Sequence, residues 1–223
     1  MVFSYDERSG AQTLKIEGDT FRHLFLSRRS KEDEVFLFRN LIDGVLYEYR
    51  VQAIGKKDAI LTLNGQCSDA DTDFVGCEIA WCVVDPKTIE KTLPMLNEVG
   101  VSKIYFIYSD RSQKNFKIDT DRLNRILISS CCQCGRTALM KTVTYKNLDE
   151  FCDMNIPFFA FDFGGEGIGG VRNGTFLIGP EGGFSERERE LIKKRAQKIL
   201  SFGAPNVLKS ETAAVAAATL ALI

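Results

Sequence analysis

The sequence predicts an α/β domain that follows a small β domain, and three observations support this fold class. Short apolar strands separated by turn signals fill residues 1 to about 66, whereas strands alternate with helices beyond residue 74. The chain has 223 residues, of which 44% are hydrophobic and 26% charged, so it is globular and long enough for two domains. The predicted domains are therefore residues 1–73 and 74–223.

The N-terminal region is predicted to form a small β-barrel or sandwich. Turn signals such as Ile42-Asp43-Gly44 separate its strands. The predicted strands are residues 2–5, 13–16, 34–39, 45–54 and 59–63. A helix over residues 19–26, with Asp19 as its cap, is the exception. Residues 66–76 carry three aspartates among small residues and predict a linker.

The C-terminal region is predicted to form a mostly parallel sheet covered by helices on both faces. The predicted strands are residues 78–84, 103–109, 158–163 and 175–179, and the predicted helices are residues 87–99, 121–135, 185–197 and 210–222. From residue 212 the last helix is apolar or small on nearly every side, which predicts burial all round, inside the domain or at a subunit interface. No signal peptide or membrane-length apolar run occurs, so we expect a cytoplasmic protein without a membrane partner.

The charge balance restricts how the chain could bind nucleic acid. Its 29 Lys and Arg nearly match its 30 Asp and Glu, so RNA binding would need a local basic patch. Arg22, Arg28, Arg29 and Lys31 form the densest cluster of the N-terminal region. A phosphate-binding patch and a solvated helix face both explain this cluster, because three acidic residues follow at 32–34.

The seven cysteines form an odd set, which argues against a disulfide framework and favours a reducing compartment. Cys131, Cys132 and Cys134 could be ligands of a zinc site, which is a more specific interpretation than buried thiols. However, the chain has one histidine, His23, and no second ligand pair at suitable spacing, so we predict buried thiols on a helix and no metal. His23 is more typical of a packed or hydrogen-bonded histidine than of a general base.

Two glycine-rich segments suggest ligand loops, with different specificity. Residues 165–170 match G-x-G-x-x-G, but they lead into another strand, whereas a dinucleotide loop must open a helix. A flexible turn is the preferred interpretation, and a dinucleotide-dependent oxidoreductase is the alternative. Residues 178–185 place three glycines and a proline between a strand and a helix, which suits a ligand held by backbone groups. Ser185 and Glu188 form a predicted capping box for that helix.

Two expectations concern single residues of the predicted ligand loops. A Cβ at Gly182 is expected to restrict φ and to fill ligand space. Ser210 is the expected N-cap of the last helix.

Together these motifs resemble the RsmE family of ribosomal RNA uracil-N3 methyltransferases, in the SPOUT superfamily. The central match is Ile178-Gly-Pro-Glu-Gly-Gly-Phe-Ser followed by Val207-Leu-Lys-Ser-Glu-Thr-Ala. Further segments are similar to family elements: Arg22-His23-Leu24, Lys91 with Glu98-Val-Gly-Val, Asp110-Arg111-Ser112, and Cys132-Gln-Cys-Gly-Arg136. Cys134 and Lys209 depart from the family's usual Ser and Arg, and Lys209 loses the planar fork of arginine.

The resemblance implies a PUA-like barrel followed by a SPOUT α/β domain with a deep trefoil knot, and a homodimer that methylates 16S ribosomal RNA of the small ribosomal subunit. The implied S-adenosyl-L-methionine site comprises Phe161, Asp162, Phe163, Ile178, Gly179, Pro180, Glu181, Gly182, Gly183, Val207, Leu208, Ser210 and Thr212. The implied RNA contacts are Arg22, His23, Arg28, Arg29 and Arg111.

The reaction needs positioning rather than a metal, because the sulfonium methyl is already electrophilic. Uracil N3 becomes nucleophilic as its proton leaves, so a nearby cation or donor that stabilises the developing anion would help. Arg136 is the first catalytic candidate, and Glu211 and Lys209 follow for orientation or proton handling. A charge that complements the helix macrodipole is the other interpretation of Arg136. A non-catalytic RNA-binding module is a third alternative for the whole chain.

Overall fold

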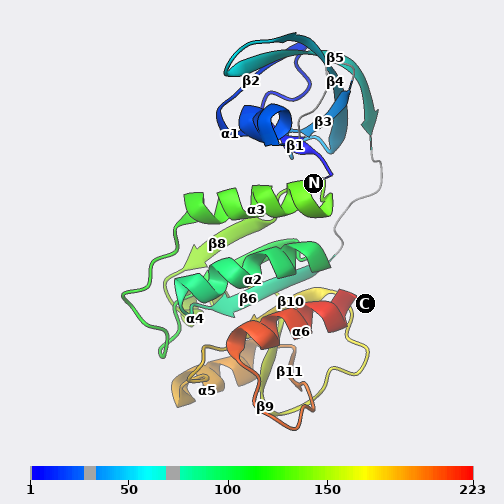
Figure 1. The fold of residues 1–223 in the computed structure, drawn as a ribbon. Coiled ribbons are helices and arrows are strands. Elements are labelled where there is room, and N and C mark those ends of the chain that lie inside the picture. The colour runs from blue at the N-terminus through cyan, green and yellow to red at the C-terminus, as the bar shows by residue number, and fades with distance from the viewer. Residues whose placement is uncertain (1, 28–33, 69–75, 223) are drawn as a thin grey trace. The chain divides into compact units, whose positions relative to one another are not determined.

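The computed structural model describes residues 2–27, 34–68 and 76–222 (Figure 1). Arg28, Arg29 and Lys31, and the predicted boundary near residue 74, lie outside the described residues. The chain divides into two compact units, the first comprising Met1–Asp73 and Ile128–Leu139 and the second Phe74–Leu127 and Met140–Ile223. The N-terminal unit therefore includes a second segment of chain, which the predicted domain boundary assigns to the other domain.

The first unit is built on a five-stranded sheet in the order β1-β3-β4-β5-β2. The strands are β1 (Ser4–Tyr5), β2 (Thr13–Glu17), β3 (Val35–Arg39), β4 (Val45–Ile54) and β5 (Asp58–Ser68). β1 pairs parallel with β3, and the other neighbours are antiparallel. In the described part of the chain no ladder joins β1 to β2, so the hydrogen-bonded sheet is open rather than a closed barrel. β5 continues to Ser68, so the first residues of the predicted linker are strand.

The predicted helix at residues 19–26 is a short α-helix, α1 (Gly18–Phe21), that continues as a π-helix, η1 (Arg22–Ser27). The prediction that Asp19 caps it is wrong, because Glu17 occupies the N-cap position and makes no side-chain cap bond. The Asp19 carboxylate instead accepts a hydrogen bond from Arg22. The apolar side of this helix packs into the core around Phe38 and Tyr49.

A second core cluster of this unit includes one end of α3 (Thr120–Cys134). Phe3 and Leu41 pack there against the buried Cys131 and Cys132, and the backbone N–H of Val2 donates to the Cys132 carbonyl at 2.8 Å. Burial raises the pKa of the Cys132 thiol to about 11. The prediction of buried thiols on a helix is confirmed for these two cysteines but is wrong for the exposed Cys134.

The second unit contains a six-stranded sheet in the order β11-β9-β10-β6-β7-β8. Its strands are β6 (Cys77–Cys82), β7 (Lys103–Ile107), β8 (Lys141–Tyr145), β9 (Phe158–Gly167), β10 (Gly174–Ile178) and β11 (Lys198–Ser201). Every ladder in it is parallel, which confirms the predicted parallel sheet. The sequence analysis missed β8 and β11, which are short.

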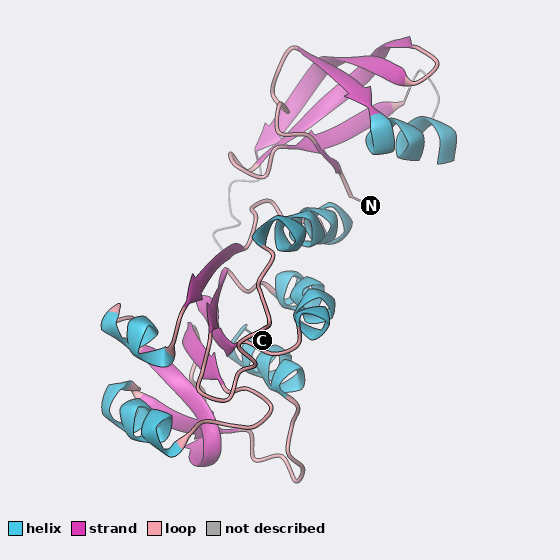
Figure 2. Cartoon of the chain, turned by 90° about the vertical axis from the view of Figure 1, so that its left-hand side faces the viewer, coloured by secondary structure: helices cyan, strands magenta, loops and turns pink. Residues whose placement is uncertain are grey.

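Helices cover both faces of this sheet, as Figure 2 shows. Besides α3 they are α2 (Pro86–Val99), α4 (Leu148–Asp153), α5 (Glu186–Arg195) and α6 (Ser210–Leu222). α6 packs on α2, β6 and β10, while α4 contacts α5 and β8. α6 is not buried all round within one chain, because Ala214 and Ala217 are buried but Leu220 is exposed, so of the two expected settings burial inside the domain is wrong and burial at a subunit interface stays a prediction. Among the described residues, no helix is both long enough and apolar enough to cross a membrane.

Candidate functional site

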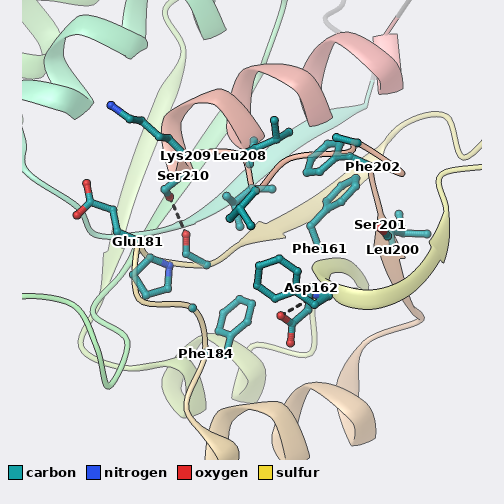
Figure 3. A pocket seen from close by; sticks show the side chains of 18 of the residues that line it. Phe161, Asp162, Glu181, Phe184, Leu200, Ser201, Phe202, Leu208, Lys209 and Ser210 are labelled. Atoms are coloured by element: carbon teal, nitrogen blue, oxygen red, sulfur yellow. Dashed lines mark hydrogen bonds between the residues drawn. The ribbon is translucent and has the colours of Figure 1, made fainter.

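A cavity of about 420 Å³ lies at the carboxyl ends of β9, β10 and β11 (Figure 3). This edge of a parallel sheet is where α/β folds bind ligands, and the volume suits one small molecule. The lining residues come from the middle of β9, the ends of β10 and β11, the loops that follow these two strands, and the first turn of α6. They are Phe161, Asp162, Phe163, Ile178, Gly179, Pro180, Glu181, Gly183, Phe184, Leu200, Ser201, Phe202, Gly203, Ala204, Asn206, Val207, Leu208, Lys209, Ser210 and Ala213.

One wall of the cavity forms where β9 leaves its ladder with β11. Ile199 pairs with Ala160, but the next residue, Leu200, pairs with Glu166. Residues 161–165 therefore form an excursion that has no partner on β11. The chain returns at Gly165, where a Cβ would lie 2.6 Å from the backbone carbonyl carbon and oxygen of Leu200, so only glycine fits. The prediction that this glycine-rich segment is a turn is thus wrong up to Gly167, because β9 continues through it.

Two aromatic rings form part of the inner wall. The Phe161 and Phe202 rings are stacked, with centroids 4.1 Å apart and planes only 8° from parallel. Phe161 also contacts Phe176 on β10, at a centroid distance of 6.2 Å. This row of rings fixes the start of the excursion against the sheet and makes that side of the cavity apolar.

An ion pair holds the next residue of the excursion. Arg189 of α5 donates from Nε to Asp162 Oδ2 at 2.8 Å, and the Asp162 carboxylate also accepts from the Phe163 backbone N–H at 2.9 Å. Arg189 further pairs with Glu186 at 3.3 Å. The negative charge of Asp162 is therefore balanced by Arg189, although Asp162 lines the cavity.

The opposite wall is the loop after β10, which Ser210 holds in place. Ser210 Oγ donates to the Gly179 carbonyl at 2.6 Å and accepts from Trp81 Nε1 at 2.8 Å. The expectation that Ser210 caps α6 is wrong, because its hydroxyl is used in these two bonds. A Cβ on Gly179 would lie 3.1 Å from the Phe184 ring, so this position also requires close approach.

The outer side of the same loop is braced by the turn after β7 and the start of α5. Arg111 Nη1 donates to the Gly182 carbonyl at 2.5 Å. The fully buried carboxylate of Glu188 accepts from the backbone N–H of Asp110 at 2.8 Å and from that of Ser185 at 2.9 Å. Together with the bond from Glu188 N–H to Ser185 Oγ, these contacts confirm the predicted capping box.

Comparison with known proteins places this architecture in a family. The model of the family described as RNA methyltransferase domain matches residues 74–222, and that of the RNA methyltransferase PUA domain matches residues 16–64. The chain is 42% identical, over 229 aligned positions and all of both chains, to ribosomal RNA small subunit methyltransferase E of Helicobacter pylori strain J99. The chain belongs to the ribosomal RNA small subunit methyltransferase E family. The resemblance inferred from the sequence motifs is thereby confirmed.

Solved structures agree on the fold. The ribosomal RNA small subunit methyltransferase E of Neisseria gonorrhoeae bound to S-adenosyl methionine superposes with a TM-score of 0.83 at 21% identity, over 98% of this chain and 95% of that one. A Legionella pneumophila methyltransferase in complex with S-adenosyl methionine gives 0.81 at 22% identity, with the same coverage. The mixed α/β methyltransferase domain and the PUA domain are therefore shared with these structures.

Within this methyltransferase, the structure brings most predicted cofactor residues to one cavity. Eleven of the thirteen line it, and Gly182 and Thr212 do not. The expectation that a Cβ on Gly182 would strain the backbone and fill ligand space is also wrong. The positive φ belongs to the next residue, Gly183 (67°), and a Cβ on Gly182 would make ordinary contact with Arg111 at 3.5 Å. Phe184, residues 200–204 and Ala213 also line the cavity and were not predicted from the sequence; for residues 200–204 the reason is that the end of β11 was not placed.

The predicted catalytic residues are divided between the units. Lys209 lines the cavity and is exposed, and Glu211 lies in the first turn of α6. Glu211 Oε2 is buried and has no hydrogen-bond partner among the described residues. Arg136 belongs to the first unit, just beyond α3, and is only 6% exposed; burial lowers the pKa of its guanidinium.

The residues predicted to contact RNA differ in their exposure and in their bonding partners. Arg22 is exposed and pairs with Asp19, whereas His23 is half-buried, with Nε2 buried and without a partner in the described chain. Arg111 is exposed but its guanidinium is bonded to the glycine loop. Among the residues that the structure describes, no group of three His, Cys, Asp or Glu could hold a metal ion.

Proposed function

We propose that this methyltransferase transfers the methyl group of S-adenosyl-L-methionine to N3 of a uridine in 16S ribosomal RNA of the small subunit. The cavity at the ends of β9, β10 and β11 carries the proposal, because its glycine loop offers backbone groups and its walls are apolar. Family membership and the relatives solved with S-adenosyl methionine support the cofactor and the RNA class.

The cavity fits the cofactor in size and chemistry. Its volume of about 420 Å³ suits one cofactor molecule, and residues 178–181, Gly183 and residues 206–210 would hold it. When bound, the cofactor supplies an electrophilic methyl group. The protein then has to align uracil N3 and manage the N3 proton.

Lys209 and Glu211 are suited to these proton and charge tasks. Uracil N3 loses a proton on methylation, and the proposed acceptor is Glu211, which lies next to the cavity residue Ser210 without lining the cavity itself and whose Oε2 has no hydrogen-bond partner among the described residues. The exposed ammonium of Lys209 can stabilise negative charge that develops on O2 or O4. Arg136 stays a catalytic candidate from the family resemblance.

The product test is mass spectrometry of nucleosides after incubation with small ribosomal subunits. We expect 3-methyluridine; 5-methyluridine, a ribose methyl or no methyl would reject the proposed chemistry.

Calorimetric titration with S-adenosylhomocysteine tests the cavity as the cofactor site. Glu211→Gln keeps the shape but loses proton acceptance, so we expect slower single-turnover methylation with cofactor affinity unchanged. Equal rates for wild type, Glu211→Gln, Lys209→Ala and Arg136→Ala would remove all three from the catalytic set.

Substrate presentation is the proposed task of the first unit. N3 lies on the Watson–Crick edge, so the target uridine must be unpaired or flipped out. The PUA domain, with Arg22 and with Arg28 and Arg29 outside the described residues, would hold flanking RNA through phosphates. Arg28→Ala with Arg29→Ala is expected to weaken RNA binding and flatten its salt dependence.

The proposal includes a cytoplasmic homodimer and a deep trefoil knot, both implied by the family resemblance. Half-exposed apolar residues on α6, with the exposed Leu220, and the exposed Met95 on the adjoining α2 support an interface there. Light scattering should then give about 50 kDa, twice the 25.0 kDa of one chain. A mass of one chain at micromolar concentration would contradict the dimer.

A further inference from the structure

Phe163 stands apart from the other aromatic residues of the cavity because its side chain is exposed to solvent. It is 70% exposed, whereas the neighbouring Phe161 is buried. Several large hydrophobic residues are exposed in the described part of the chain, and Phe163 is the one aromatic residue among them. It also lines the cavity, so it lies at the rim, where a molecule outside the cavity meets one inside.

The backbone that carries Phe163 is fixed on both sides. Before it, Phe161 is stacked on Phe202 and Asp162 is paired with Arg189. After it, the chain returns to β11 at Gly165, in direct contact with the Leu200 backbone. The Asp162 carboxylate also accepts the Phe163 N–H. The exposed ring therefore sits on a braced support, which lowers the entropy cost of binding a planar partner.

The exposure of the ring argues against a main role in holding the cofactor. The cavity has room for one small molecule, and the stacked Phe161 and Phe202 rings already form its inner apolar wall. A ring at the rim faces whatever must approach the methyl group from outside. In the proposed reaction that is an unpaired uracil base.

Stacking also fits the chemistry of methylation at N3. Hydrogen bonds from the protein to the Watson–Crick edge would compete for the atom that reacts. Contact with an aromatic ring uses the face of the base and leaves N3, O2 and O4 free. Lys209, which is exposed on the same cavity, remains available to the base oxygens.

We propose that Phe163 is the platform on which the target uracil stacks beside the methyl donor. This inference rests on the proposed methyltransferase function and assigns to Phe163 the substrate base rather than the cofactor. It makes Phe163 a residue that touches the substrate and positions its N3.

The test compares Phe163→Ala and Phe163→Tyr with Met154→Ala, using the full-length protein. Met154 is a matched control because it is also an exposed apolar residue of the second unit, at 56% exposure, and does not line the cavity. We measure S-adenosylhomocysteine affinity by calorimetry and single-turnover methylation of small ribosomal subunits over a range of subunit concentrations. Thermal unfolding of each variant verifies that it is folded.

We expect Phe163→Ala to lower methylation efficiency by roughly 5- to 150-fold, the range for loss of one stacked base, while S-adenosylhomocysteine affinity stays within twofold. Phe163→Tyr should restore most of the rate, and Met154→Ala should match wild type. Weaker S-adenosylhomocysteine binding by Phe163→Ala would assign the ring to the cofactor and overturn the inference, as would an unchanged rate. Failure of the wild-type protein to methylate any subunit would instead reject the proposed function itself.

Discussion

The two glycine-rich segments of the second unit differ in their relation to the cavity, and their glycines serve different purposes. Residues 165–170, which match a dinucleotide fingerprint, do not line the cavity, and Gly165 is needed for contact with the backbone of β11. In residues 179–183, which match no general nucleotide motif, the loop lines the cavity and is held by Ser210 and Arg111. Glycine spacing alone therefore does not identify a ligand loop, whereas the neighbours of each glycine do.

The largest expected effect is on the first segment. Gly165→Val would place a Cβ 2.6 Å from the Leu200 carbonyl group, so β9 and β11 must separate locally. We expect the free energy of unfolding in urea to fall by about 3 kcal/mol or more. The matched control is Gly167→Ala in the same strand, where a Cβ meets nothing within 4 Å. Equal stability of the two variants would show that Gly165 is not needed for packing.

A second effect is expected on cofactor binding through the other segment. Gly179→Ala places a Cβ 3.1 Å from the Phe184 ring inside the cavity wall, so the loop must shift. We expect S-adenosylhomocysteine affinity to fall about tenfold, which corresponds to about 1.4 kcal/mol. Gly182→Ala, whose Cβ makes ordinary contact with Arg111, should change affinity less than twofold. A larger loss of affinity for Gly182→Ala would instead support the expectation from the sequence that a Cβ at Gly182 fills ligand space.

The bond that holds this loop to the sheet gives a third test. Ser210→Ala leaves the Nε1–H of the fully buried Trp81 without its acceptor, which costs about 1–3 kcal/mol of unfolding free energy. Thr219→Ala is the control within α6, because the Thr219 hydroxyl donates to the Val215 carbonyl of its own helix. Thermal unfolding should separate the two variants by several degrees. No separation would mean that the Trp81–Ser210 bond contributes little.

The smallest effect concerns pH and the charged groups that brace the second segment. Hydrogen bonds from Arg187 and then Ser185 lower the pKa of Asp110, despite its partial burial. A lowered folded-state pKa stabilises the protein above the unfolded pKa of about 4, and this stability is lost as pH falls through the folded value. Asp110 is 39% exposed, so the contribution is about 0.5 kcal/mol or less.

Asp110→Asn should therefore reduce the loss of stability below pH 4, measured by urea unfolding from pH 3 to pH 6. Asp153→Asn is a suitable control, because Asp153 pairs with Arg195 at 3.4 Å away from this loop. An unchanged acid dependence in Asp110→Asn would contradict the proposed source of the stabilisation.

Local sequence patterns predicted the parallel sheet, the capping box at Ser185 and the two ligand loops that follow β10 and β11. They could not reveal the excursion of β9, because it depends on β11, a four-residue strand that is distant in sequence. The same long-range pairing explains why residues 200–204 were missed. Ser210 was placed at the correct site with the wrong role, since the partners of its hydroxyl, Trp81 and Gly179, come from other strands.

The first unit is built from two separate segments of the chain, and this determines when its fold can be completed during synthesis. Residues 128–139 belong to this unit, and Cys131 and Cys132 form one core cluster with Phe3 and Leu41. A nascent chain that ends at residue 73 therefore lacks part of the apolar surface that covers Phe3. The N-terminal unit begins to form first, but its core closes only after the ribosome has translated more than half of the chain.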